Sequence, residues 1–327
     1  MIILPNRLNC SPHMRSRATA LVLGAARALS AKNGRASTWP SMQRASEPGY
    51  ASFNYCAPDV TAVSTRRDIA GSDGELEGAA WSPTTVRVHD GRGRPWSLEK
   101  NGFKLVADPI DADLDLYDDA AVTGRYYGMC EALVAEQCPG ATVVKAFDHN
   151  VRCEEGKASG RRLKGGSNVQ APAGIVHGDY TAASAPRRLA QLAEAPKTND
   201  ALNRPPLDGV EVVGRRFAFI NVWRPISEVR STPLACCDAE TLRDDDLLTF
   251  KIYYEDRVGE NYFARHHQAH KWYYFPRMQR NEALLIQQWD SKTDAAKFAL
   301  HSAFADPSSP PDAPARESIE VRLVVVY

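Results

Sequence analysis

One triplet in this chain has the residue types and the spacing of a metal site: His177-Gly178-Asp179, the only H-x-D sequence present. The apolar segment 173–176 before it predicts a strand, and residues i and i+2 of a strand project from the same face. His177 and Asp179 would then point together into a barrel interior, with Gly178 facing away. These are two ligands of the 2-His-1-carboxylate triad, which leaves positions on iron(II) open for cosubstrate and oxygen. The alternative is a hydrogen-bonded histidine and aspartate on the surface.

The third ligand is predicted from the order of residues downstream. Four histidines follow the triplet, and only His301 is followed at moderate distance by an R-x-S sequence, Arg316-Glu317-Ser318. In a double-stranded β-helix the second histidine lies near the end of one strand and an arginine starts the last strand, here 319–326. A guanidinium at the barrel floor binds a carboxylate through two hydrogen bonds, and Ser318 adds a hydroxyl. An elongated dicarboxylate such as 2-oxoglutarate could therefore chelate the iron at one end and contact Arg316 at the other.

A predicted strand over 216–223 adds candidates whose roles stay open. Asn221 and Trp223 share one face of it, and Arg224 takes the other face. If the strand enters the barrel, Asn221 could hydrogen-bond the cosubstrate's carboxylate and Trp223 could form a wall of the pocket. Otherwise the segment is an aromatic core strand with a surface arginine.

Three further groups of residues could lie around the predicted site. Tyr180 follows Asp179 directly, and Tyr273 lies on a predicted strand, so both are candidates for the substrate pocket, although packing also explains Tyr273. The sequence His266-His267-x-x-His270 lacks the glutamate of H-E-x-x-H and lies beside a strand rather than in a helix. We interpret it as part of a loop at the substrate rim rather than as a second metal site.

The elements around these residues predict a mainly β chain with flanking helices. Apolar residues recur at helical spacing over 113–137, ending at Cys138-Pro139-Gly140, and a second helix is expected over 184–195. A loop is expected over 150–172. Strand signals without intervening helices point to a cupin-like jelly roll, a double-stranded β-helix with its core at about 141–327. The segments are 141–147, 216–223, 234–237, 250–254, 271–276, 283–289 and 319–326.

Composition limits the partners and the compartment. The 327 residues include 40 Lys+Arg and 40 Asp+Glu, so no charge excess favours nucleic acid, and no apolar run reaches the ~20 residues of a membrane span. Seven cysteines without C-x-x-C spacing indicate a reducing cytoplasm. Residues 1–46 contain no Asp or Glu and predict a disordered or targeting-like extension, or a segment ahead of a start at Met42. Residues 47–327 would form a single domain of open oligomeric state.

Four segments resemble a known family: 221–225 (NVWRP), 233–238 (PLACCD), 270–278 (HKWYYFPRM) and 313–322 (APARESIEVR). They are similar to hydroxylases and desaturases of secondary metabolism, a family that includes a fungal gibberellin desaturase and cephamycin methoxylase-type proteins. The resemblance covers about residues 85–327. It implies a cupin-like β-helix that binds iron(II), usually with 2-oxoglutarate, and oxidises a small metabolite with O2.

Carried over by position, the resemblance makes His177, Asp179 and His301 the metal ligands and Arg316 the cosubstrate-binding arginine. The wide separation of His177 and His301 suits this family. Two other functions stay open: an iron oxidase or methoxylase-type enzyme that needs no 2-oxoglutarate, and a non-catalytic β-barrel binding protein. The substrate itself is not indicated by any segment, and the loops 150–172 and 255–269 are where its specificity would lie.

Overall fold

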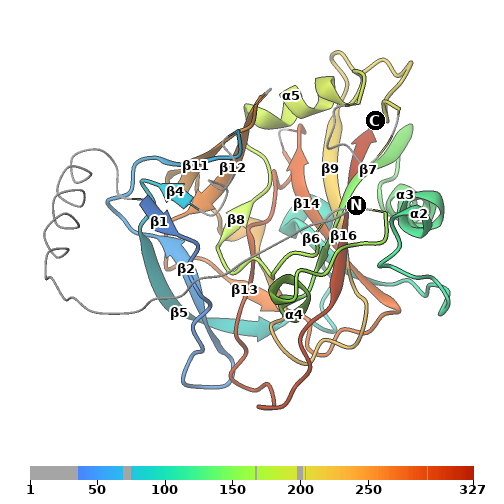
Figure 1. Cartoon of the computed structure of the whole chain (residues 1–327). Helices are drawn as coiled ribbons and strands as arrows, with labels where there is room; N and C mark the ends of the chain where they lie inside the picture. Colours follow the sequence, from blue (N-terminus) through green and yellow to red (C-terminus); the bar gives the residue numbers. More distant parts are fainter. Residues whose placement is uncertain are drawn as a thin grey trace, which may run out of the picture. The chain divides into compact units, whose positions relative to one another are not determined.

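The computed structural model describes residues 36–68, 75–165, 168–196, 202, 204–255, 257–292 and 294–327. Residues 36–327 belong to one compact unit, which begins ahead of the predicted domain boundary at residue 47. Most of the predicted extension, residues 1–35, lies outside the described residues, so its nature stays a prediction. Within the described part the strands form a sheet of eleven and a sheet of five (Figure 1).

Eight strands form a jelly roll, and this confirms the predicted fold class. Four of them lie together in the five-stranded sheet, in the order β14-β9-β16-β7, and four lie together in the larger sheet, in the order β8-β15-β10-β13. The chain passes back and forth between the sheets, as in a double-stranded β-helix. In chain order the strands are β7 (Val143–Arg152), β8 (His177–Gly178), β9 (Phe217–Pro225), β10 (Leu234–Cys237), β13 (Trp272–Tyr274), β14 (Glu282–Asp290), β15 (His301–Ala303) and β16 (Ser318–Val326).

The remaining strands extend both sheets. A hairpin inserted between β10 and β13 pairs with β8 and with β3, and at the opposite side β5, itself paired with β2, pairs with β13. The strands are β1 (Ala36–Thr38), β2 (Tyr50–Cys56), β3 (Val63–Arg66), β4 (Glu75–Glu77), β5 (Trp81–Asp90), β6 (Phe103–Ala107), β11 (Leu247–Tyr253) and β12 (Val258–Ala264). Strand β12 occupies much of the predicted loop 255–269. It was not predicted as a strand because its sequence, VGENYFA, lacks a clear alternation of apolar and polar residues.

Helix α3 packs on the outer face of the five-stranded sheet, whereas α5 packs with residues of its inner face. The predicted helix over 113–137 begins later, where the Asp118 side chain accepts hydrogen bonds from the amides of Ala120 and Ala121. A short helix lies inside the predicted loop 150–172. The helices are α1 (Leu98–Asn101), α2 (Asp119–Ala121), α3 (Tyr127–Gln137), α4 (Glu154–Ala158) and α5 (Ser184–Gln191), with single turns at Val122–Tyr126, Ala239–Thr241 and Asp244–Asp246.

The two faces of β16 have opposite character, and this positions the site. Its apolar residues Ile319, Val321 and Leu323 pack in one cluster with residues of α3, such as Val134. Successive residues of a strand project to opposite faces, so the alternate residues face the other sheet. The polar ones among them, which follow Arg316, are Ser318, Glu320 and Arg322. The interior of the jelly roll therefore carries a row of polar side chains.

Two predictions from composition can be compared with the structure. Six cysteines lie among the described residues, and all six are free and buried. The vicinal pair Cys236 and Cys237 forms the end of β10. Among the described residues, no helix has both the length and the apolar character needed to cross a membrane.

Candidate metal centre

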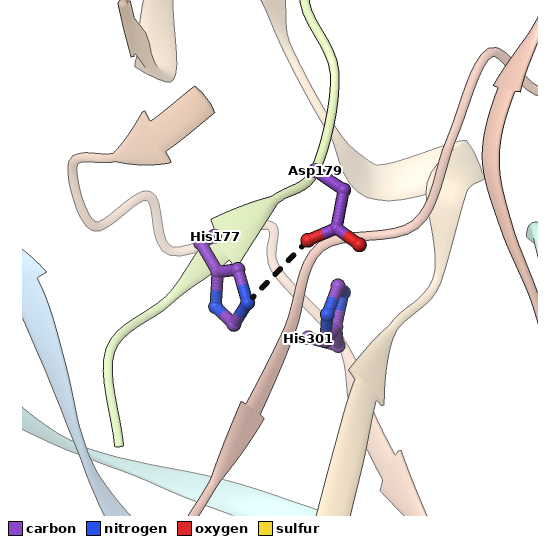
Figure 2. Close-up of side chains that lie close together, drawn as sticks. All are labelled: His177, Asp179 and His301. Carbon is purple, nitrogen blue, oxygen red and sulfur yellow. Dashed lines mark ion pairs between the residues drawn. The ribbon is translucent and has the colours of Figure 1, made fainter. Parts of the chain in front are cut away.

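Three side chains on two adjacent strands converge in the jelly roll (Figure 2). His177 lies on β8 directly opposite His301 on β15, and their ring centroids are 4.3 Å apart. Asp179 follows β8, with its Oδ1 3.8 Å from His177 Nε2. One ligand atom of each residue lies within 4.8 Å of the others. The structure thus brings together the three residues that the sequence singled out as metal ligands.

Both imidazoles are oriented by backbone carbonyl groups. His177 Nδ1 lies 2.7 Å from the Ile175 oxygen, and His301 Nδ1 lies 3.3 Å from the Ala299 oxygen. Because a carbonyl oxygen only accepts, each Nδ1 carries the proton and each Nε2 keeps its lone pair. Burial, then the neighbouring His301, lowers the pKa of His177 to about 4, and burial lowers the pKa of His301 as well. At neutral pH both rings are therefore neutral, as metal ligation requires.

The two oxygens of the Asp179 carboxylate have different surroundings. Oδ1 faces His177, whereas Oδ2 accepts a hydrogen bond from Asn221 Nδ2 at 3.0 Å and one from Arg322 Nε at 3.4 Å. Burial acts to raise the pKa of Asp179, but Arg322, the two histidines and the Asn221 hydrogen bond together outweigh it and hold the pKa well below its usual range. The amide of Asn221, which we predicted to bind the cosubstrate, is thus engaged by a predicted metal ligand. Asn221 lies on β9 and Asp179 follows β8, in the other sheet, and the sequence does not specify how these two strands are positioned relative to each other.

Arg316 and Ser318 form a second polar group in the same interior. Arg316 is 3% exposed, and its Nη1 donates to the Thr232 oxygen at 2.8 Å, while its Cζ lies 5.4 Å from the centroid of the Trp223 ring. Arg316 Nε and the Ser318 hydroxyl are buried without a hydrogen-bond partner in the described structure. Burial, then the charge of Arg152, lowers the pKa of Arg316 to about 9, so it stays charged at neutral pH. Unpartnered buried donors beside a guanidinium fit a carboxylate.

The two groups lie at different levels along β16, with Glu320 between Arg322 and Ser318. Arg322 pairs across the sheet with Asn221, and Glu320 pairs with Trp223, the residue beneath the Arg316 guanidinium. Two residues of a strand advance about 7 Å. Trp223 therefore lies between the level of Asn221, which contacts Asp179, and that of Arg316, and its role as a wall of the substrate pocket stays a prediction.

Four charged residues of this interior were missed by the sequence analysis. Arg322 contacts the carboxylates of Asp148 and Glu320, at 2.7 Å and 3.3 Å, and Arg152 on β7 lies opposite Ser318. A signal existed in the sequence, because polar residues occupy every second position from 316 to 322 ahead of an apolar strand. Alternating polar residues on a strand ordinarily face solvent. They can be assigned to the interior only when both faces of the strand are known to be covered.

The other candidates make packing contacts in the structure, and their roles at the substrate pocket stay predictions. Tyr180 stacks on Phe219 at 4.5 Å between ring centroids. Tyr273 is 7% exposed and lies in an apolar cluster with Trp223. His270 is buried, with Nδ1 3.2 Å from the Tyr55 hydroxyl and Nε2 3.3 Å from Asp246. Among the described residues, the histidines at 266–270 do not form a group of three potential metal ligands.

Comparisons with known proteins agree with this geometry. A family model described as an oxidoreductase/YMDC permease-like domain matches residues 53–326. The chain is 34% identical over 254 residues to the Fe(II)/2-oxoglutarate-dependent dioxygenase nvfI of Aspergillus novofumigatus, which covers 75% of this chain and 84% of the relative. It is 30% identical over 260 residues to the hydroxylase/desaturase efuI of Hormonema carpetanum, covering 74% and 81%. The solved structure of an iron and alpha-ketoglutarate-dependent endoperoxidase NvfI superposes with a TM-score of 0.70 and 28% identity, over 85% of this chain and 97% of that one.

Proposed function

This chain belongs to the Fe(II)/2-oxoglutarate-dependent oxygenases of secondary metabolism, and on that premise we propose that it oxidises an unactivated C–H bond of a small metabolite. In this proposal His177, Asp179 and His301 hold the iron, and Arg316 with Ser318 binds the far carboxylate of 2-oxoglutarate. One observation carries it: three convergent ligand atoms share a barrel interior with a buried guanidinium and hydroxyl that have unpartnered donors.

The donor set suits iron(II). Two neutral imidazoles and one ionised carboxylate form the 2-His-1-carboxylate set, which leaves positions open for other ligands. When bound, iron(II) and 2-oxoglutarate supply the activation of O2, in which the keto acid loses CO2 and becomes succinate while the substrate is oxidised. The contribution of the chain is to fix the ligands, to bind both ends of the cosubstrate and to exclude water.

The charge of Arg316 fits an anionic cosubstrate. Its guanidinium is buried, and the neighbouring charge of Arg152 further disfavours its charged form. A buried charge requires compensation, which a carboxylate of the cosubstrate would supply while accepting from the unpartnered Arg316 Nε. An iron oxidase that binds no keto acid would leave Arg316 Nε without a partner.

Turnover tests the proposal. Purified protein with iron(II), 2-oxoglutarate and a panel of small metabolites should consume O2 and release one succinate per keto acid decarboxylated. Hydroxylation would insert one oxygen atom into the substrate, whereas desaturation would remove two hydrogens, and mass spectrometry of the product separates these outcomes. Oxidation of a substrate at an unchanged rate without 2-oxoglutarate would refute the assignment. We place the reaction in the reducing cytoplasm, because the six described cysteines are free.

A further inference from the structure

We infer that Arg322 is a positioning residue that, together with Asn221, holds the Asp179 carboxylate so that a single oxygen is presented to the metal. The inference rests on the proposed function, since it concerns how the metal centre keeps positions open for the cosubstrate. It assigns a role to a residue outside the predicted ligand set.

The two oxygens of the Asp179 carboxylate are not equivalent. Asp179 Oδ2 receives two donors, Asn221 Nδ2 at 3.0 Å and Arg322 Nε at 3.4 Å. Asp179 Oδ1 has His177 Nε2 as its neighbour at 3.8 Å, on the side of the convergent imidazoles (Figure 2). An oxygen that accepts from an amide and a guanidinium is a weaker metal ligand than a free one, because its lone pairs are already engaged.

The fold itself brings both donors to the same oxygen. Asn221 on β9 and Arg322 on β16 are direct cross-strand partners. Both strands belong to the five-stranded sheet, whereas Asp179 follows β8 of the larger sheet. The metal-ligand carboxylate is therefore tied across the barrel to a rigid pair on the opposite sheet.

The Arg322 side chain is itself fixed. Its Nη1 contacts Asp148 Oδ2 at 2.7 Å and its Nη2 contacts Glu320 Oε1 at 3.3 Å, and its side chain is 19% exposed. With both terminal nitrogens held, the Nε group is directed at Asp179. A guanidinium has this fork geometry, and a lysine ammonium at the same position would keep the charge without it.

The number of oxygens that Asp179 presents determines how many coordination positions on the metal stay open. In a six-coordinate metal the triad leaves three positions, of which a chelating keto acid takes two and O2 takes one. If both oxygens of Asp179 became ligands, one of these three positions would be lost. We therefore expect Arg322 to protect cosubstrate affinity rather than metal affinity.

The test uses Arg322→Lys and Asn221→Ala, with Mn(II) as a stable probe of the site. Three quantities are measured: Mn(II) affinity of the metal-free protein, 2-oxoglutarate affinity of the Mn(II)-loaded protein, and the relaxation of water protons by bound Mn(II). The third reports the number of exchangeable waters on the metal. We expect Arg322→Lys to retain Mn(II) binding and to lower 2-oxoglutarate affinity by about tenfold or more. Water relaxation should fall by about a third, as three open positions become two.

Arg224→Lys is the matched control. Arg224 is a fully buried arginine on β9 that faces away from the site and donates to the Tyr126 hydroxyl at 2.7 Å and the Arg280 carbonyl at 2.8 Å. Its substitution should lower stability without changing water relaxation or keto-acid affinity. Asn221→Ala should lower water relaxation and keto-acid affinity, as Arg322→Lys does. If Arg322→Lys does not fold, Asn221→Ala alone tests the inference.

The inference is overturned if water relaxation in both site variants equals that of the wild type, or if Mn(II) affinity and 2-oxoglutarate affinity fall in parallel with stability. Failure of the proposed function looks different. Mn(II)-loaded wild type would then bind no 2-oxoglutarate, while the relaxation measurement would still show whether Arg322 limits Asp179 to one oxygen.

Discussion

Arg316→Met separates the binding role of Arg316 from a role in folding, because the two properties should change in opposite directions. Methionine has a similar length and keeps the packing on Trp223, but it removes the guanidinium. We expect 2-oxoglutarate binding to weaken strongly while the stability of the metal-free protein stays the same or increases. Few residues in a barrel interior would give this combination.

The magnitudes follow from the surroundings of Arg316. Hydrogen bonds to a charged group contribute about 1.5–3 kcal/mol each, so losing a two-bond contact with a carboxylate costs about 3 kcal/mol or more, or roughly 100-fold in affinity. In the metal-free protein Arg316 donates one hydrogen bond, to Thr232, and its Nε has no partner. Replacing a poorly compensated buried charge by an apolar side chain is neutral or stabilising, here by up to about 2 kcal/mol.

Two measurements check this prediction. Calorimetric titration of Mn(II)-loaded protein with 2-oxoglutarate gives the affinity, and denaturant unfolding of the metal-free protein gives the stability. Arg224→Met is the control, because its guanidinium is held by Tyr126, Asp108 and Arg280. It should lose about 3–5 kcal/mol of stability and keep its keto-acid affinity. The reasoning is refuted if Arg316→Met binds 2-oxoglutarate like the wild type, or if it is destabilised as much as the control.

Two further predictions concern stability. Burial lowers the pKa of His270 from 6.5 to about 4. Below pH 6.5 the unfolded chain therefore binds a proton that the folded chain does not. The free energy of unfolding should fall by up to about 3 kcal/mol as the pH drops from 6.5 to 4. Denaturant unfolding across this range should show a smaller fall in His270→Gln, and parallel curves for variant and wild type would contradict it. Thr232 is a β-branched residue with a φ of 47°, so Thr232→Gly should raise the free energy of unfolding by about 1 kcal/mol, whereas Thr232→Ala, which keeps a Cβ at positive φ, should gain less.

The sequence was sufficient to predict the jelly roll and the convergence of His177, Asp179 and His301. The strand period places His177 and Asp179 on one side, and the order of His301 before Arg316 fits the last turns of a β-helix. Strands β9, β10, β14 and β16 were found near their observed bounds, since their apolar or β-branched runs are dense.

Other features depend on tertiary arrangement and could not be predicted. Asn221 was assigned to the correct face, but its hydrogen bond to Asp179 could not be foreseen, because the position of β9 relative to β8 is set by packing between the two sheets. Arg322 and Glu320 alternate with apolar residues, a pattern that fits a solvent-facing strand as well as a polar barrel interior. Strand β2 was missed because residues 47–85 lack a clear period around it.

Anaerobic titration of the Fe(II)-loaded protein with 2-oxoglutarate tests the central claim most directly, because chelation of iron(II) by a keto acid gives a visible charge-transfer band. We predict that the band saturates at one 2-oxoglutarate per chain and is absent from His301→Ala, a variant that should lose the metal while its fold is retained. The claim would be contradicted if metal-loaded wild type developed no band, or if His301→Ala developed the full band.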